Sequence, residues 1–87
     1  MDNLDCMSAD DLWALWESIY KRPKTVARSM FPDKPTGYVI AARDIGYYAC
    51  NKATAMRCRL SGDITAALGY EAICERIYQR LPNYAVW

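Results

Sequence analysis

The sequence predicts an all-α domain of about four helices, arranged around a long antiparallel helical hairpin. Apolar residues recur at spacings of three and four along most of the chain, which is the period of a helix packed on one side. No segment alternates between apolar and polar residues for long enough to predict a strand. The 87 residues suffice for one hydrophobic core and not for two, so residues 1–87 are expected to form a single small domain.

The first helix is expected over residues 9–21. Ser8 followed by Asp11 has the spacing of a capping box, in which side chains satisfy free backbone amides at a helix start. Pro23 cannot continue a helix and ends this one. The apolar residues that recur at helical spacing are Leu12, Trp13, Leu15, Trp16, Ile19 and Tyr20.

A short second helix is expected over residues 24–31, where the helical pattern repeats more weakly. Pro32 closes it. The segment FPDKPTG follows, and its two prolines and one glycine predict a loop.

The third helix, over residues 38–60, has the longest apolar stripe in the chain. That stripe consists of Tyr38, Ala42, Ile45, Ala49, Ala53, Met56 and Leu60. Gly62 can supply a left-handed helix end and Asp63 the cap of a fourth helix over residues 64–81, which stops at Pro82.

The short turn at Gly62 requires the last two helices to lie antiparallel. Positions equally distant from Gly62 should then lie level, so Ala55 is expected opposite Gly69 and Cys50 opposite Cys74. Close approach of the helices would explain a glycine inside a helix, where it costs roughly 1 kcal/mol relative to alanine. The first two helices are expected to cover the hairpin with Trp13, Trp16 and Phe31.

The formal net charge of +1 conceals an uneven distribution. Residues 1–20 contain five acids and no base, whereas residues 21–87 contain eleven bases and five acids. An acidic first helix complements its own dipole. The rest of the chain can in addition present a basic surface to an anion or to an acidic partner.

The sequence predicts a cytoplasmic protein without a membrane segment. The segment MDNLDCMSADD lacks the basic and apolar regions of a secretory signal, and the longest apolar run covers only residues 38–42. The cysteines Cys6, Cys50, Cys58 and Cys74 are therefore expected to be reduced. They contain no C-x-x-C pair, so we expect buried thiols rather than a zinc site. Cys50 and Cys74 remain a possible redox pair across the hairpin.

The chain lacks the residues from which most catalytic sites are built. It contains no histidine, which disfavours catalytic triads and most catalytic zinc centres. No phosphate-binding loop or hydrolase motif is present, and Glu71 and Glu75 lie one turn apart on an expected solvent face. We therefore predict no enzymatic activity, no catalytic residue, no cofactor and no metal.

Aromatic residues point to a protein-interaction module, either a homodimer or a subunit or regulator of a larger assembly. Three tryptophans and seven tyrosines are many for this length, and aromatic residues are enriched in interaction hot spots. Trp13, Trp16 and Ile19 are expected to pack inside. The candidate partner-binding residues at an exposed rim are Tyr47, Tyr48, Tyr78, Tyr84 and Trp87.

Basic residues supply the alternative interpretation, a nucleic-acid-associated or anion-binding protein. Lys21, Arg22, Lys24 and Arg28 cluster where the first helix ends and the second begins, and Arg57 and Arg59 are candidates to join them. Stacking of bases on exposed tyrosines would add about 1–3 kcal/mol per base. The same basic residues also complement helix dipoles on a solvated face, so both interpretations stay open.

Two segments resemble known families. Residues 53–83 resemble a tetratricopeptide-type helical hairpin, which implies a helical hairpin with a protein-binding role; Glu71 and Glu75 depart from that pattern. The matching positions are Ala55, Gly62-Asp63, Ala67-Leu68, Tyr70 and Leu81-Pro82-Asn83. Residues 4–19, LDCMSADDLWALWESI, resemble the first segment of bacterial histone-like nucleoid-structuring proteins, which implies an oligomerising helix. Pro23 then interrupts where that family continues into a coiled coil.

Overall fold

The computed structural model describes residues 4–85, apart from the side chain of Asp5. Four α-helices account for most of this part of the chain and no strand occurs in it, so the predicted all-α fold is confirmed. The helices are α1 (Ala9–Lys21), α2 (Pro23–Met30), α3 (Val39–Leu60) and α4 (Ile64–Arg80). Single turns of 3-10 helix lie at Leu4–Cys6, Pro35–Tyr38 and Asn83–Ala85. None of the described helices is long and apolar enough to cross a membrane.

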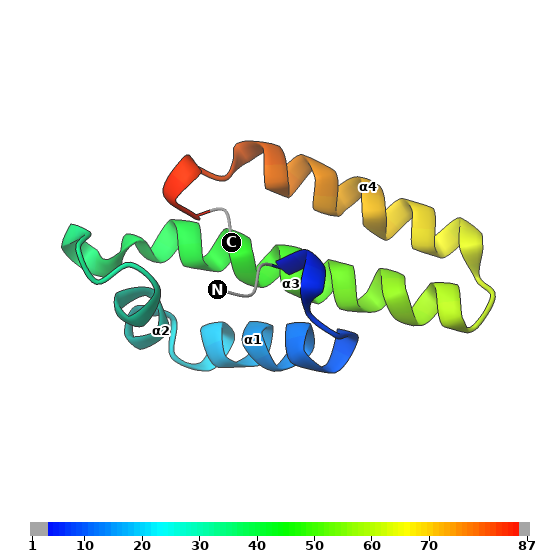
Figure 1. The fold of residues 1–87 in the computed structure, drawn as a ribbon, viewed down its shortest axis with the longest axis horizontal. Coiled ribbons are helices and arrows are strands. Elements are labelled where there is room, and N and C mark those ends of the chain that lie inside the picture. The colour runs from blue at the N-terminus through cyan, green and yellow to red at the C-terminus, as the bar shows by residue number, and fades with distance from the viewer. Residues whose placement is uncertain (1–3, 86–87) are drawn as a thin grey trace.

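Helix α3 is the centre of the molecule (Figure 1). Helix α4 runs antiparallel along one side of it, and α1 and α2 lie along the other side. The N-terminal helices therefore pack mainly on α3, and not across both helices of the hairpin as the sequence suggested. The molecule is elongated as a result, with extents of 43 × 22 × 21 Å.

The helix ends form as their sequences predict. The Ser8 hydroxyl accepts a hydrogen bond from the Asp11 amide at 3.1 Å, and the Asp63 carboxylate accepts one from the Ala66 amide at 3.2 Å. Pro23 occupies the first position of α2, where a backbone N–H would have no partner within the helix, so the N–H that proline lacks costs nothing. Gly62 has φ +85°, the left-handed conformation that only glycine adopts without strain.

The turn before α3 moves the start of that helix by one residue. Thr36, Gly37 and Tyr38 all have positive φ, at 60°, 68° and 45°. Because Tyr38 is left-handed it cannot belong to the helix, and α3 begins at Val39 rather than at residue 38. Gly37 is buried against α2, where an added Cβ would lie 3.1 Å from the Arg28 backbone nitrogen.

Small residues let the neighbouring helices approach α3 from two sides. Buried alanines line α3, and Gly46 lies at the contact with α1. A Cβ added at Gly46 would lie only 3.2 Å from Cγ2 of Ile19, which is itself buried. Leu4, Leu12 and Ile45 are the largest side chains with almost no exposed surface, so the first turn of the described chain closes part of the core.

The expected close contact at Gly69 is wrong. Ala55 is buried in the hairpin, but Gly69 is exposed and no atom lies within 4 Å of the place where its Cβ would be. The reason is rotation of α4 about its axis, because Ala67, Cys74 and Ile77 face α3 and Gly69 lies to one side of that stripe.

Candidate interaction site

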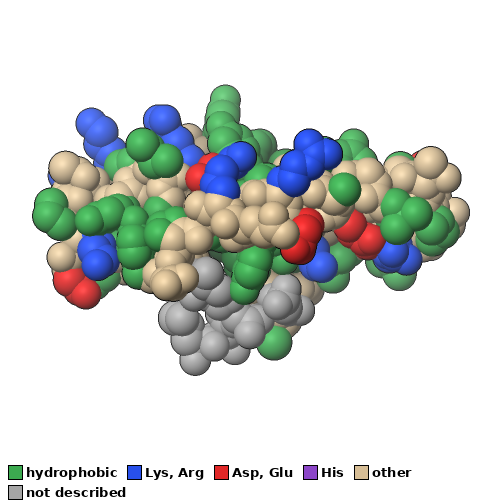
Figure 2. Space-filling model, turned by 90° about the horizontal axis from the view of Figure 1, so that it is seen from above, with side chains coloured by type: hydrophobic (Ala, Val, Ile, Leu, Met, Phe, Trp, Pro, Cys, Tyr) green, Lys and Arg blue, Asp and Glu red, His purple; other side chains and the backbone are tan. Residues whose placement is uncertain are grey.

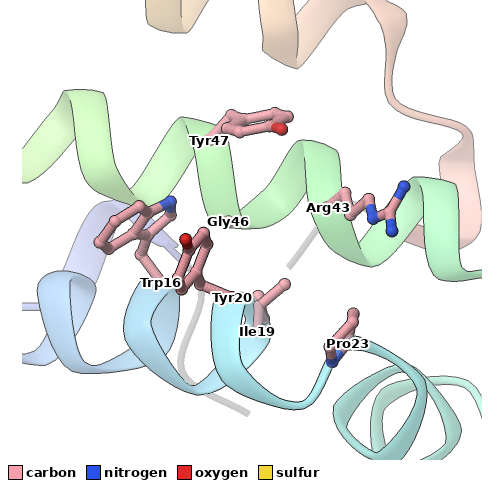
Figure 3. Close-up of a pocket in the computed structure, with 7 residues that line it drawn as sticks. All are labelled: Trp16, Ile19, Tyr20, Pro23, Arg43, Gly46 and Tyr47. Atoms are coloured by element: carbon pink, nitrogen blue, oxygen red, sulfur yellow. The ribbon is translucent and has the colours of Figure 1, made fainter.

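A cleft between α1 and α3 opens to solvent and is walled by aromatic side chains (Figure 3). Its volume is about 210 Å³. Trp16 and Tyr20 extend from α1 and Tyr47 from α3, and Ile19 lies deeper between the helices. The remaining lining residues are Pro23, Arg43 and Gly46.

Helical spacing and one glycine shape this cleft. Trp16 and Tyr20 are four residues apart on α1, so their rings lie one above the other with centroids 5.4 Å apart and planes 24° apart. Gly46 lets α1 approach α3 closely at the cleft floor. Tyr20 keeps 73% of its surface exposed and Tyr47 keeps 52%, so both rings are available to a partner.

Arg43 is the one charged residue among those that line the cleft. It is exposed and has no ion pair or hydrogen bond within residues 4–85. Arg22 and Lys24 flank the lining residue Pro23 in sequence and are also exposed and without an ion pair there, but neither of them lines the cleft. Arg22 instead lines a second hollow beside α1, together with Glu17 and Lys21.

The acids closest in sequence to these residues are engaged elsewhere. Asp44 accepts a hydrogen bond from Arg80 at 3.0 Å, which ties α3 to α4. Glu17 lies 3.7 Å from Lys21 on α1. Neither acid forms an ion pair with Arg43 or Arg22.

The space-filling view places many lysine and arginine side chains along one long edge of the molecule, with apolar side chains between them (Figure 2). This upper edge in Figure 2 corresponds to the side facing away from the viewer in Figure 1. Figure 3 views the molecule from that side, so that α2 lies at the right of α1 and not at the left as in Figure 1.

The predicted aromatic rim is only partly on the surface. Tyr47 is exposed and lines the cleft, but Tyr48 is buried at 5% exposure, which corrects the expectation that it lies at a rim. Tyr78 is half-buried, with its ring centroid 5.9 Å from that of Tyr48. Trp87 lies outside the described residues.

Tyr84 is exposed but belongs to another part of the surface. Its ring meets those of Phe31 and Tyr38 edge to face, with centroids 5.4 and 4.8 Å away. Lys34 lies over it, with Nζ 4.7 Å from the ring centroid. Tyr84 therefore helps to hold the turn before α3 against the C-terminal segment, and it does not line the aromatic cleft.

One of the two arginines expected to extend the basic cluster does so and the other does not. Arg57 hydrogen-bonds Asp10 at 3.0 Å and lies over the Trp13 ring, and it lines a hollow beside α1 together with Lys21 and Arg22. Arg59 faces α4 instead, where it donates to Glu71 at 2.8 Å. That hydrogen bond holds the pKa of Glu71 below its usual value. Lys21, Arg22, Lys24 and Arg28 remain together in sequence around the junction of α1 and α2.

Tyr47 is the only one of the seven lining residues that was a predicted site residue, and the exposed walls Trp16 and Tyr20 and the cation Arg43 were missed. Trp16 was expected in the core, and Tyr20 was counted among the apolar residues that recur at helical spacing. The sequence signal that could have found them is the Trp16–Tyr20 pair at the last turn before Pro23, because a bulky aromatic at a helix end has fewer neighbours to cover it. Arg43 carries no such signal.

No disulfide joins the four cysteines, all of which lie in the described chain. Cys74 is buried, with its Sγ 3.7 Å from the Tyr48 carbonyl oxygen. Burial raises the pKa of the Cys74 thiol to about 11 and also raises the pKa of Cys50. Raised values disfavour the thiolate, which is the nucleophilic form. In the described part of the chain no three acidic or cysteine side chains gather as metal ligands would.

Comparison of this chain with protein-family models, with curated proteins and with solved structures gives no match. The resemblances to a tetratricopeptide hairpin and to nucleoid-structuring proteins therefore stay predictions. The cleft, its aromatic walls and its unpaired arginine are the features from which a function can be argued.

Proposed function

We propose that this protein is a non-enzymatic interaction module that binds a protein partner through the cleft between α1 and α3. The observation that carries this proposal is the set of three aromatic walls, Trp16, Tyr20 and Tyr47, open to solvent on one side of a small domain. Aromatic side chains supply large contact area at low entropic cost and dominate interaction hot spots.

The size of the cleft favours an anchoring side chain over a metabolite. Small-molecule sites usually have volumes of about 300–1,000 Å³ and enclose most of their ligand. At about 210 Å³ this cleft is smaller and open. Such a notch suits one or two large apolar side chains from a partner whose remaining contacts spread over the neighbouring helices.

Selection of short random peptides by display tests this proposal. The wild-type protein is the bait, and a variant carrying Tyr20→Ala and Tyr47→Ala removes peptides that bind elsewhere. We expect enriched peptides that bind the wild type and lose at least about tenfold in affinity to the double variant, a change of roughly 1.4 kcal/mol. Equal binding to both proteins would contradict the proposal.

A nucleic-acid-associated function is the second candidate, because Arg43 lines the same cleft as the exposed Tyr20 and Tyr47. Bases could stack on Tyr20 and Tyr47 while a phosphate meets Arg43. The measurement that favours it is binding of a single-stranded oligonucleotide that weakens steeply as salt rises. Binding that changes little with salt belongs to the first candidate.

The same proposal extends to the compartment of the protein and to the kind of partner that it binds. We place the module in the cytoplasm, since the lack of any disulfide among the four cysteines of the described chain fits a reducing compartment. A second copy of the chain or a larger assembly are both candidate partners for the aromatic face. Sedimentation velocity over a range of concentrations distinguishes them, because only self-association changes the sedimentation coefficient of the isolated protein.

A further inference from the structure

We infer that the partner segment seated at the cleft is acidic: an apolar anchor side chain flanked by aspartate or glutamate. This inference rests on the proposed function and adds the chemistry of the partner. It follows from Arg43, the one charged residue among those that line the cleft, which has no ion pair in the described chain.

Arg43 is the central element of this argument. It lines the same cleft as Trp16 and Tyr47, so a partner that buries an anchor between these rings must approach its guanidinium. Arg43 is exposed and makes no ion pair within residues 4–85. An arginine held in this position can form two parallel hydrogen bonds with one carboxylate, which gives it orientation as well as charge.

The junction of α1 and α2 carries further positive charge close in sequence to the cleft. Pro23 lines the cleft, and its neighbours Arg22 and Lys24 do not, but both are exposed and without an ion pair in the described chain. Opposite charge across an interface speeds association and excludes partners of the wrong sign. A basic partner would place like charges together at the cleft, and a neutral one would leave the cations without a counterpart.

Three other arginines are paired with acids of the fold. Arg59 and Arg80 form ion pairs with Glu71 and Asp44, so they link α3 to α4. Arg57 likewise pairs with Asp10. Arg43 differs from them because it has no such pair in the described chain and lines the cleft.

The arrangement suits a peptide more than a nucleic acid. A nucleic-acid strand needs a basic track that follows its backbone over several nucleotides. Arg57 and Arg59 would extend such a track, but both are paired and neither lines the cleft. The net charge of only +1 gives no overall field to attract a polyanion. A cleft with one unpaired arginine fits one apolar anchor with an adjacent carboxylate.

The composition of the peptides selected on the wild-type protein tests this inference. We expect aspartate or glutamate to be enriched, relative to the starting library, within a few positions of a large apolar residue. The enriched peptides are then synthesised with every acid replaced by its amide. We expect that replacement to weaken binding at least about tenfold.

Charge variants of the protein complete the test. Arg43→Glu should weaken the acidic peptides at least about tenfold, whereas Arg43→Lys should retain part of the affinity. Arg76→Glu is the matched control, because Arg76 is exposed on α4 and does not line the cleft. Circular dichroism and thermal unfolding of each variant confirm that the fold is retained.

The outcomes separate the inference from the proposed function. Peptides that depend on Tyr20 and Tyr47 but bind equally as acids and as amides overturn the inference and leave the proposed function standing. An absence of any peptide that depends on these tyrosines overturns both. Tighter binding of a single-stranded oligothymidylate than of any peptide, lost in Arg43→Glu, overturns both in favour of nucleic acid. Dimerisation that Tyr47→Ala abolishes overturns the inference in favour of a second copy.

Discussion

Two mid-helix glycines show how differently one residue type is used in this protein. Gly46 lies where α1 approaches α3, and a Cβ there would crowd Ile19. Gly69 lies in open space beside the contact between α3 and α4. The sequence pattern suggested a packing role for Gly69 and none for Gly46. Spacing alone places a residue on a helix but does not fix how that helix is rotated against its neighbour.

Replacing Gly69 with alanine should stabilise the fold. Alanine in a helix interior is favoured over glycine by roughly 0.5–1 kcal/mol, and no neighbour obstructs the new methyl group. Gly46→Ala is the matched comparison and should gain less, because Ile19 must move to make room. Urea unfolding of both variants measures this difference. A loss of stability in Gly69→Ala would show that the open face of α4 is occupied in solution.

The buried thiol of Cys74 makes stability depend on alkaline pH. Burial raises its pKa to about 11 from a reference value of 9.0, so the folded state keeps a proton that the unfolded chain releases. This contribution is complete below pH 9 and is lost as the pH rises toward about 11. The free energy of unfolding should therefore fall over this range, and fall less in Cys74→Ala. Equal slopes in the two proteins would contradict the burial of this thiol.

At the scale of the elements, local chemistry predicted the helices well. The bounds of α1 agree with prediction, and those of α2, α3 and α4 differ by no more than one residue at an end. Ser8, Pro23, Gly62 and Asp63 mark these ends through interactions with residues close in sequence, which is why the sequence sufficed. The left-handed turn at Tyr38 was beyond prediction, because tertiary contacts select it against the residue's own preference.

The cap of α4 gives a prediction at this scale. Asp63→Ala removes the carboxylate that accepts from the Ala66 amide and should cost about 1 kcal/mol. Asp63→Asn should lose much less, since asparagine caps helices about as well as aspartate. Thermal and urea unfolding compare the three proteins. A large loss in Asp63→Asn would mean that charge, and not capping, is what this residue provides.

At the scale of the whole molecule, the candidate site depends on which side chains of α3 its neighbouring helices leave exposed. Tyr47 and Tyr48 are neighbours in sequence, yet one lines a cleft and the other is buried at 5% exposure. The sequence predicted a surplus of aromatics but could not say which ones the packing of α1 would leave exposed. Trp16 and Arg43 line the same cleft although they are 27 residues apart in sequence, and Tyr20 lies between them in sequence. Their proximity becomes visible only in the folded chain.

Core and cleft residues should respond differently to truncation. Leu12→Ala removes a side chain with no exposed surface and should destabilise the fold by about 2–5 kcal/mol. Tyr47→Ala removes a half-exposed ring from the cleft and should cost about 1 kcal/mol or less. Unfolding in urea measures both. A loss in Tyr47→Ala as large as that in Leu12→Ala would assign Tyr47 to the core rather than to a binding surface.

The most direct test of the cleft as the binding site is chemical-shift mapping of the nitrogen-15-labelled protein during titration with an enriched acidic peptide. We expect the largest shifts at the amides of Gly46 and Tyr47 and at the indole N–H of Trp16, with the amides around Gly69 unchanged. Weaker shifts with the amide form of the peptide would agree with the charges at Arg43. Shifts centred on α4, or none at Trp16 and Tyr47 with saturating peptide, would contradict the account.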